Sequence, residues 1–251
     1  MTMMGKTTIT LSRVMLTADL RDFATIFFTF VFPAGLLVTL VLSMGQIPSP
    51  HGGNSVNEIS SNVVAFGVAF VAVFAGAQHI ATWRANGMLD VLRSAPVSVG
   101  NIIIAQARVG SIFAILQTIF LIVLAVTPWL GMKLVMTAPL GLLGVALGYF
   151  MFFSLGVILA NLVPSVTAVT MLSLIVVIGL GVIGGAVTPL EYMPDWVQNV
   201  GPFVPVFHIR ELITFLLTGI GSWSQAGLSS LYLLAVGGVL FLIARKTMRW
   251  S

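Results

Sequence analysis

Long apolar runs alternate with short polar segments along the whole chain. Six runs each supply about 18 or more mainly apolar residues, enough for a helix rising about 1.5 Å per residue to cross a bilayer. These runs are Phe23–Met44, Asn62–Ala81, Gly110–Trp129, Ala138–Val163, Ala168–Val187 and Gly227–Ala244. In lipid such runs must be helical, because an open strand would leave backbone N–H and C=O groups unpaired. The pattern predicts an all-α polytopic membrane protein with six transmembrane helices.

A seventh apolar run, Phe203–Thr218, is shorter and carries His208, Arg210 and Glu211 near its middle. A charged side chain at the centre of a bilayer costs about 2.5–3.5 kcal/mol on insertion scales. We therefore expect a re-entrant or interfacial helix between spans five and six, within an outer segment that covers residues 188–226.

The segment before the first span mixes charged and apolar residues. Arg13, Asp19 and Arg21 are interspersed with leucine, valine and methionine, a pattern typical of an amphipathic helix on the cytoplasmic leaflet. We expect this helix within residues 1–22. The apolar run that follows is about twenty residues long, longer than a signal-peptide core, so we expect the first span to be retained.

Charge supports a membrane protein and gives its orientation. Only 7% of the residues are charged, whereas a soluble domain carries about 25%. With six spans, nine of the 11 lysine and arginine residues fall on the side that holds both termini. That side carries Lys6, Arg13, Arg21, Arg84, Arg93, Arg108, Arg245, Lys246 and Arg249, and the other carries Lys133 and Arg210. Both termini are therefore predicted to be cytoplasmic. We expect a multi-pass protein of the cell membrane (inner or plasma membrane) that contacts the lipid bilayer and binds no nucleic acid.

The predicted spans contain almost no groups that could carry chemistry. His79 and Arg108 lie near span ends, and the chain has no cysteine. This argues against a membrane-embedded enzyme and against a carrier driven by an ion gradient, which usually needs buried ionisable residues. A membrane anchor for an ATPase that does not itself transport is a further alternative. The sequence GKTT at Gly5–Thr8 lacks the strand and earlier glycine of a phosphate-binding loop, so we expect no ATP there.

The stretch WRANGMLDVLRSAPVS, Trp83–Ser98, places a charged cluster between spans two and three. Asn86 is a candidate N-cap, Pro96 would stop the helix, and Ser98 would cap the helix of span three. One face would carry Met88, Leu89 and Leu92, and Asp90 and Arg93 are spaced to pair on another. The residues alone leave two interpretations open: a solvated connector, or a docking helix for a cytoplasmic partner.

An aromatic stripe follows one face of span two. Its members recur every four residues and are Phe66, Phe70, Phe74 and Gln78. The stripe either packs against neighbouring helices and lipid or lines a path for a bulky apolar substrate. Two glycine pairs, Gly144 with Gly148 and Gly181 with Gly185, predict close helix contacts, either within the chain or at the seam with a second chain.

The run GGAVTPLEYMPDWVQNVGPFVP starts at Gly184 and leads into the outer segment, and its prolines exclude one continuous helix. It resembles the signature of type-two ATP-binding-cassette (ABC) exporter permeases: a glycine-rich helix end, a Pro-Leu-Glu-x-Met-Pro-x-Trp-like stretch and a proline-rich start of a short outer helix. The matching residues are Gly184, Gly185, Pro189, Leu190, Glu191, Met193, Pro194, Trp196 and Pro205.

The charged cytoplasmic stretch is similar to the loop of the same family, which carries a Gly-Thr-x-Glu-x-Leu run and then a Pro-x-Ser element. The matching residues are Gly87, Asp90, Leu92, Pro96 and Ser98. Met88 stands where the family has threonine, and Asp90 stands where it has glutamate. These departures leave open which residue makes the main polar contact with the ATPase.

The resemblance covers the whole chain and implies a single permease domain over residues 1–251, with a coupling loop at residues 82–106. Two chains would pair as a homodimer and dock on two copies of a cytoplasmic ATP-binding subunit. ATP and magnesium would bind to those partners, and this chain would hold no catalytic residue or metal. The implied coupling residues are Asn86, Gly87, Met88, Asp90, Leu92, Arg93 and Pro96. The exported cargo would be a hydrophobic drug, antibiotic, lipid or glycan-type molecule.

Overall fold

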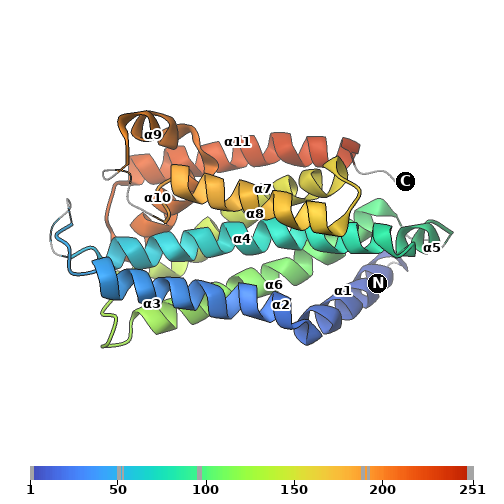
Figure 1. Cartoon of the computed structure of the whole chain (residues 1–251), viewed down its shortest axis with the longest axis horizontal. Helices are drawn as coiled ribbons and strands as arrows, with labels where there is room; N and C mark the ends of the chain where they lie inside the picture. The colour runs from blue at the N-terminus through green and yellow to red at the C-terminus, as the bar shows by residue number, and fades with distance from the viewer. Residues whose placement is uncertain are drawn as a thin grey trace.

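The structure is a computed structural model that describes residues 3–49, 52, 54–94, 98–187, 190 and 193–247. Within these residues the chain forms helices and no strand, and the long helices run roughly along the length of the molecule (Figure 1). The helices are α1 Met3–Arg21, α2 Phe23–Ile26, η1 Phe27–Val31, α3 Phe32–Met44, α4 Val56–Ala85, α5 Met88–Ser94, α6 Val99–Ala125, η2 Ala138–Leu140, α7 Gly141–Leu162, α8 Val166–Ile183, α9 Asp195–Val200, η4 Gly201–Phe203, α10 Pro205–Thr218 and α11 Trp223–Thr247.

Within the described residues, six helical segments are each long and apolar enough to cross a membrane, which confirms the predicted number of spans. They are Phe23–Met44, Val56–Ala85, Gly100–Ala125, Ala138–Leu162, Val166–Ile183 and Trp223–Thr247. The third span begins at Gly100 rather than Gly110 because Ser98 starts its helix. The Ser98 Oγ accepts a hydrogen bond from the backbone N–H of Asn101 at 3.2 Å, so the predicted cap is confirmed.

The central helix is α4, which packs against α3, α6, α7, α8 and α10. In its most apolar stretch 78% of the residues are buried, against 22% in the spans formed by α8 and α11. Its approach to α7 is so close that a Cβ atom at Gly76 would overlap the backbone carbonyl of Phe153, and one at Gly156 would overlap that of Val73. The other spans therefore assemble around a tightly fixed α4–α7 pair.

The predicted glycine pairs pack the chain against itself. Gly144 and Gly148 on α7 face side chains of α10, and Gly181 on α8 faces the ring of Phe66 on α4. Gly185 faces Arg210 and the side chain of Leu190. Of the two interpretations, contact within the chain accounts for all four glycines.

Pro33 lies within the first span and disturbs its helix. Its ring removes one backbone N–H and crowds the preceding turn, which breaks the regular hydrogen-bond ladder. The chain responds with a π-helical turn, η1, directly before α3, in which the N–H of Phe32 bonds to the carbonyl of Phe27. The first span is therefore built from three helical pieces, α2, η1 and α3.

Different helices lie at the two ends of the molecule. Figure 1 shows α5, α1 and both chain ends at one end, and α9 at the other. The predicted N-terminal helix is present as α1 and lies along α6. Met15 is buried against this neighbour at 1% exposure, whereas Val14 and Leu20 are exposed. Helix α1 thus has one face held by the protein and another that presents apolar side chains outward.

The seventh apolar run forms α10, as a separate short helix. The segment α9–η4 and helix α10 are bent by 78° relative to each other, as in a re-entrant loop or a broken span. Pro205 opens α10, and Gly219, at a φ of 76°, ends it in the left-handed conformation. This is the helix expected between spans five and six.

Candidate functional site

The segment between α4 and α6 forms a short exposed helix, α5. Helix α4 ends at Ala85, and Gly87 turns the chain at a φ of 73°, a conformation that favours glycine. The side-chain oxygen of Asn86 accepts a hydrogen bond from the backbone N–H of Met88 at 3.2 Å. The helix itself begins at Met88, so Gly87 holds the N-cap position, one residue after the predicted cap Asn86.

The faces of α5 differ from the predicted ones in detail. Leu89 is buried at 5% exposure, whereas Met88 and Val91 are 42% and 62% exposed. Asp90 is also exposed. Leu89 thus anchors the helix to the protein, while its neighbours present an apolar and acidic surface outward. Pro96 and the side chains of Leu92 and Arg93 lie outside the described residues.

Arg84, in the last turn of α4, clamps the end of α7. Its Nη1 donates to the backbone carbonyls of Ala160 and Val163 at 2.8 and 3.3 Å, and its Nη2 donates to Oδ1 of Asn161 at 3.0 Å. A cation at a helix C-terminus satisfies free carbonyls and interacts favourably with the helix dipole. From the sequence, Arg84 could be counted only among the basic residues that orient the chain. Its hydrogen-bond partners lie far along the chain.

The outer signature begins with the helix end of α8. Gly185 adopts a φ of 74°, and the N–H of Ala186 bonds to the carbonyl of Gly181 at 2.9 Å, which closes a Schellman-type cap. Pro194 precedes α9, and Trp196 is 62% exposed on that helix. Met193 forms part of the turn ahead of α9. Pro189 and Glu191, which the resemblance includes, lie outside the described residues.

Arg210 connects α10 to the C-terminal end of α8. Its Nη1 donates to the carbonyl of Gly185 at 3.2 Å, and the same oxygen accepts from Nδ2 of Asn62 at 3.4 Å. Its Nη2 lies 2.7 Å from Oε1 of Glu211, and its guanidinium lies 5.0 Å from the ring centre of Phe207. The charges of the seventh run are therefore compensated within the chain.

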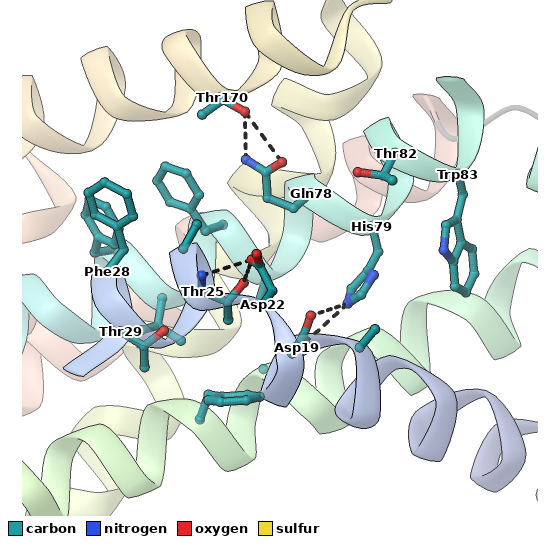
Figure 2. A pocket seen from close by; sticks show the side chains of 18 of the residues that line it. Asp19, Asp22, Thr25, Phe28, Thr29, Gln78, His79, Thr82, Trp83 and Thr170 are labelled. Carbon is teal, nitrogen blue, oxygen red and sulfur yellow. Dashed lines mark hydrogen bonds and ion pairs between the residues drawn. The ribbon is translucent and has the colours of Figure 1, made fainter. Parts of the chain in front are cut away.

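A cavity of about 440 Å³ lies where α1, α2, η1, α4, α6 and α8 meet. Its wall combines an apolar side with polar groups (Figure 2). The residues that line it are Ala18, Asp19, Asp22, Ala24, Thr25, Phe28, Thr29, Phe70, Val71, Phe74, Ala75, Gln78, His79, Thr82, Trp83, Asn86, Gly110, Phe113, Thr170 and Leu174. The volume falls within the range of about 300–1,000 Å³ typical of small-molecule sites.

The aromatic stripe of α4 divides at this cavity. Phe66 packs on Gly181 and is absent from the lining, so its role is helix packing. Phe70, Phe74 and Gln78 line the cavity, and the rings of Phe70 and Phe74 stack with centres 4.6 Å apart. Phe66 therefore fits the packing interpretation, and the other three residues border a cavity; that this cavity is a substrate path stays a prediction.

Polar contacts across the cavity join helices that are distant in sequence. Nε2 of His79 on α4 lies 3.1 Å from a carboxylate oxygen of Asp19 on α1, and Figure 2 shows the two side chains turned toward each other. The Nε2 of Gln78 donates to the hydroxyl of Thr170 on α8 at 3.0 Å. None of Asp19, His79 and Thr170 was a predicted site residue.

Asp22 sits at the junction of α1 and α2, just before the first span. Its carboxylate accepts hydrogen bonds from the hydroxyl and the backbone N–H of Thr25 at 2.6 and 2.9 Å. The hydroxyl bond is the main reason that the pKa of Asp22 lies below its ordinary value of 3.8; partial burial opposes it. Asp22 is therefore an ionised N-cap at the rim of the cavity.

Comparison with known proteins identifies a family and two relatives that resemble this chain. A family model described as "ABC-2 family transporter protein" matches residues 8–246. The chain is 29% identical over 168 residues to the inner membrane transport permease YhhJ of Escherichia coli strain K12, and likewise to YhhJ of Shigella flexneri. The matched region is 65% of this chain and 45% of each relative, so the chain spans less than half the length of these curated relatives.

Proposed function

Because this chain belongs to the ABC-2 family of transporter proteins, we propose that it is the membrane-spanning permease subunit of an ATP-driven exporter. Permeases of this family usually work with a cytoplasmic ATPase. The partners are two copies of a cytoplasmic ATP-binding subunit, which bind ATP and magnesium, and a second permease chain in a homodimer. The observation that carries the proposal is α5, an exposed helix at the same end of the molecule as both chain ends (Figure 1).

The outward surface of α5 suits docking into a groove of an ATPase. Met88 and Val91 supply apolar contacts, and Asp90 supplies a charge that a basic residue of the partner can pair with. Gly87 and Asn86 set the angle at which α5 leaves α4. In this proposal the side of the membrane with α5 is cytoplasmic, and the outer signature with Gly185, Met193, Pro194, Trp196 and Pro205 faces the opposite side.

Movement of α5 reaches the cavity through α4. Helix α4 is continuous from Val56 to Ala85, and it carries the cavity residues Phe70, Phe74 and Gln78. Arg84 ties its last turn to α7, so a push on α5 is shared between the two helices. Closure of the ATPases then tilts these spans and opens the cavity outward. The mainly apolar wall favours a hydrophobic cargo such as a drug, antibiotic or lipid.

The proposal is tested by co-expressing the chain with its ATPase and measuring complex formation and ATP-dependent transport. Met88→Asp places a second acid on the docking surface, and we expect it to weaken the complex and abolish transport. Met136→Asp is the matched control, because Met136 is 97% exposed in a loop far from α5. Transport that continues without any ATPase, or a Met88→Asp variant that assembles and transports normally, would refute the proposal.

A further inference from the structure

The cavity at the α1–α2 junction carries more negative than positive charge. Asp19 and Asp22 both line it, and none of its described lining residues is lysine or arginine. The basic group that lines the cavity is His79, and its Nε2 lies 3.1 Å from a carboxylate oxygen of Asp19. With His79 neutral the wall holds two negative charges, and with His79 protonated it still holds one. Arg84, one turn beyond Ile80, is committed to the end of α7.

The apolar side of the cavity is made of packed aromatic rings, which offer contact area to the apolar part of a ligand. Phe28 and Phe70 stack with ring centres 6.0 Å apart, and Phe70 stacks on Phe74 at 4.6 Å. Trp83 flanks His79 on the other side, with ring centres 5.8 Å apart. Contact with these rings removes the apolar part of a ligand from water, which favours binding.

The acidic and the aromatic parts of the cavity wall lie at different places, like the charged head and the apolar body of an amphiphilic ligand. Asp19 and Asp22 lie at the boundary where α1 passes into the first apolar span. On α4, His79 contacts Asp19, and Phe70 and Phe74 lie farther from the C-terminal end of that helix, with Gln78 between them and His79 in sequence. A ligand with a charged head and an apolar body meets both in one orientation.

We propose that this cavity binds a monovalent lipophilic organic cation, of the quaternary ammonium or phosphonium type, with its charge toward Asp19 and Asp22 and its apolar groups against Phe28, Phe70 and Phe74. That such a cation is the exported cargo rests on the exporter function proposed above. The carboxylates select the sign of the charge, and the rings select for apolar bulk.

The test uses two probes of nearly the same shape and opposite charge, tetraphenylphosphonium and tetraphenylborate. Equilibrium binding is measured on the full chain in nanodiscs, with empty nanodiscs subtracted. We expect the wild type to prefer the phosphonium. The double variant Asp19→Asn, Asp22→Asn should lose about tenfold or more in phosphonium affinity, because two charge contacts are removed, while borate binding stays the same or rises.

The substitutions keep the local structure, since asparagine is as good an N-cap as aspartate and can still bond to His79. Asp195→Asn, an exposed acid on α9 outside the cavity, is the matched control and should bind both ions as the wild type does. Equal wild-type affinity for the two ions overturns the proposal. So does a double variant that keeps its phosphonium affinity or loses both ions alike.

This measurement separates the two proposals, because binding in nanodiscs needs neither an ATPase nor transport. A chain that binds the phosphonium but fails to assemble with an ATPase would refute the exporter and leave the cation site. A chain that assembles and transports but does not distinguish the ions would do the reverse.

Discussion

Asp22 shows how one side chain can serve both the fold and the cavity. Its carboxylate holds the backbone N–H and the hydroxyl of Thr25, which begins α2 where the chain enters the first span. The same residue lines the cavity. Because the ionised form accepts both bonds, folding keeps this group charged at pH values where a free aspartate would begin to protonate.

Substitutions at Asp22 should separate the cap from the charge. Asp22→Ala removes the cap and should lower the free energy of unfolding by about 1 kcal/mol, whereas Asp22→Asn should keep most of it. The folded pKa lies below 3.8, so the contribution of the charge is present above that pH and is lost as the pH falls through the folded pKa. The difference in thermal midpoint between wild type and Asp22→Asn should therefore shrink on acidification below pH 3.8.

The measurement is thermal unfolding of the purified chain across an acidic pH series. Thr17→Ala, an exposed hydroxyl that bonds within its own helix to the carbonyl of Arg13, is a suitable control on α1. A gap between wild type and Asp22→Asn that widens with acid would contradict the assigned direction of the pKa shift.

Residues that act locally were predictable, and those that act across the chain were not. Ser98 was identified as a cap, and Asn86 was placed within one residue of one, because their partners lie two or three residues away. Asp19 and His79 are 60 positions apart, and Gln78 and Thr170 are 92 apart. A single sequence contains no signal for such pairs, so the polar half of the cavity became visible only when the helices were placed together.

At the scale of elements, hydropathy predicted which segments form the membrane-spanning helices. It did not predict how long those helices are. Apolar runs fix which segments cross the membrane, because lipid requires helices of about 20 residues. Helices α4 and α6 continue beyond those runs because caps at Ser98 and Asn86, rather than a change in hydropathy, decide where they begin or end. The contact of α4 with α7 depends on which glycines face each other, a property of the packed helices.

The close α4–α7 contact gives a prediction at this scale. Gly156→Ala places a methyl group against the carbonyl of Val73, so the two helices must separate. Overpacking of this kind typically costs about 1–3 kcal/mol, a loss of roughly 2–4 °C in thermal midpoint per kcal/mol for a chain of this size. The matched control is Gly179→Ala on α8, where no atom lies within 4 Å of the added methyl group.

The control should hold or raise the midpoint, since alanine favours a helix over glycine by about 1 kcal/mol. Thermal unfolding in detergent measures both variants. Equal midpoints for the two variants would mean that α4 and α7 are not held as closely as the structure has them.

At the scale of the whole molecule, α4 joins two regions that lie toward opposite ends. Helix α5 lies at one end, and Arg210, bonded to the carbonyl of Gly185, lies toward the other. The cavity lies between them along α4. The sequence resemblance predicted both end regions separately. It did not reveal that one buried helix carries all three, because that follows from the central position of α4 among its neighbours.

Arg84 is the residue whose loss should break this connection without breaking the fold. Arg84→Gln removes the charge that holds the carbonyls of Ala160 and Val163, so α4 can move without α7. Helix α5 itself is unchanged, and assembly with the ATPase should survive. We expect ATP-dependent transport to fall by about tenfold, a loss in the usual range of coupling energies between sites, while ATP hydrolysis becomes less responsive to cargo.

Arg245→Gln on α11 is the matched control, since Arg245 is an exposed arginine at the same end of the molecule. The experiment compares complex formation, ATP hydrolysis and transport in reconstituted vesicles for both variants. Loss of assembly in Arg84→Gln would make Arg84 a folding residue, and unchanged transport would mean that α4 acts alone. Loss of transport in an intact complex is the result that links α5 to the cavity through the α4–α7 pair.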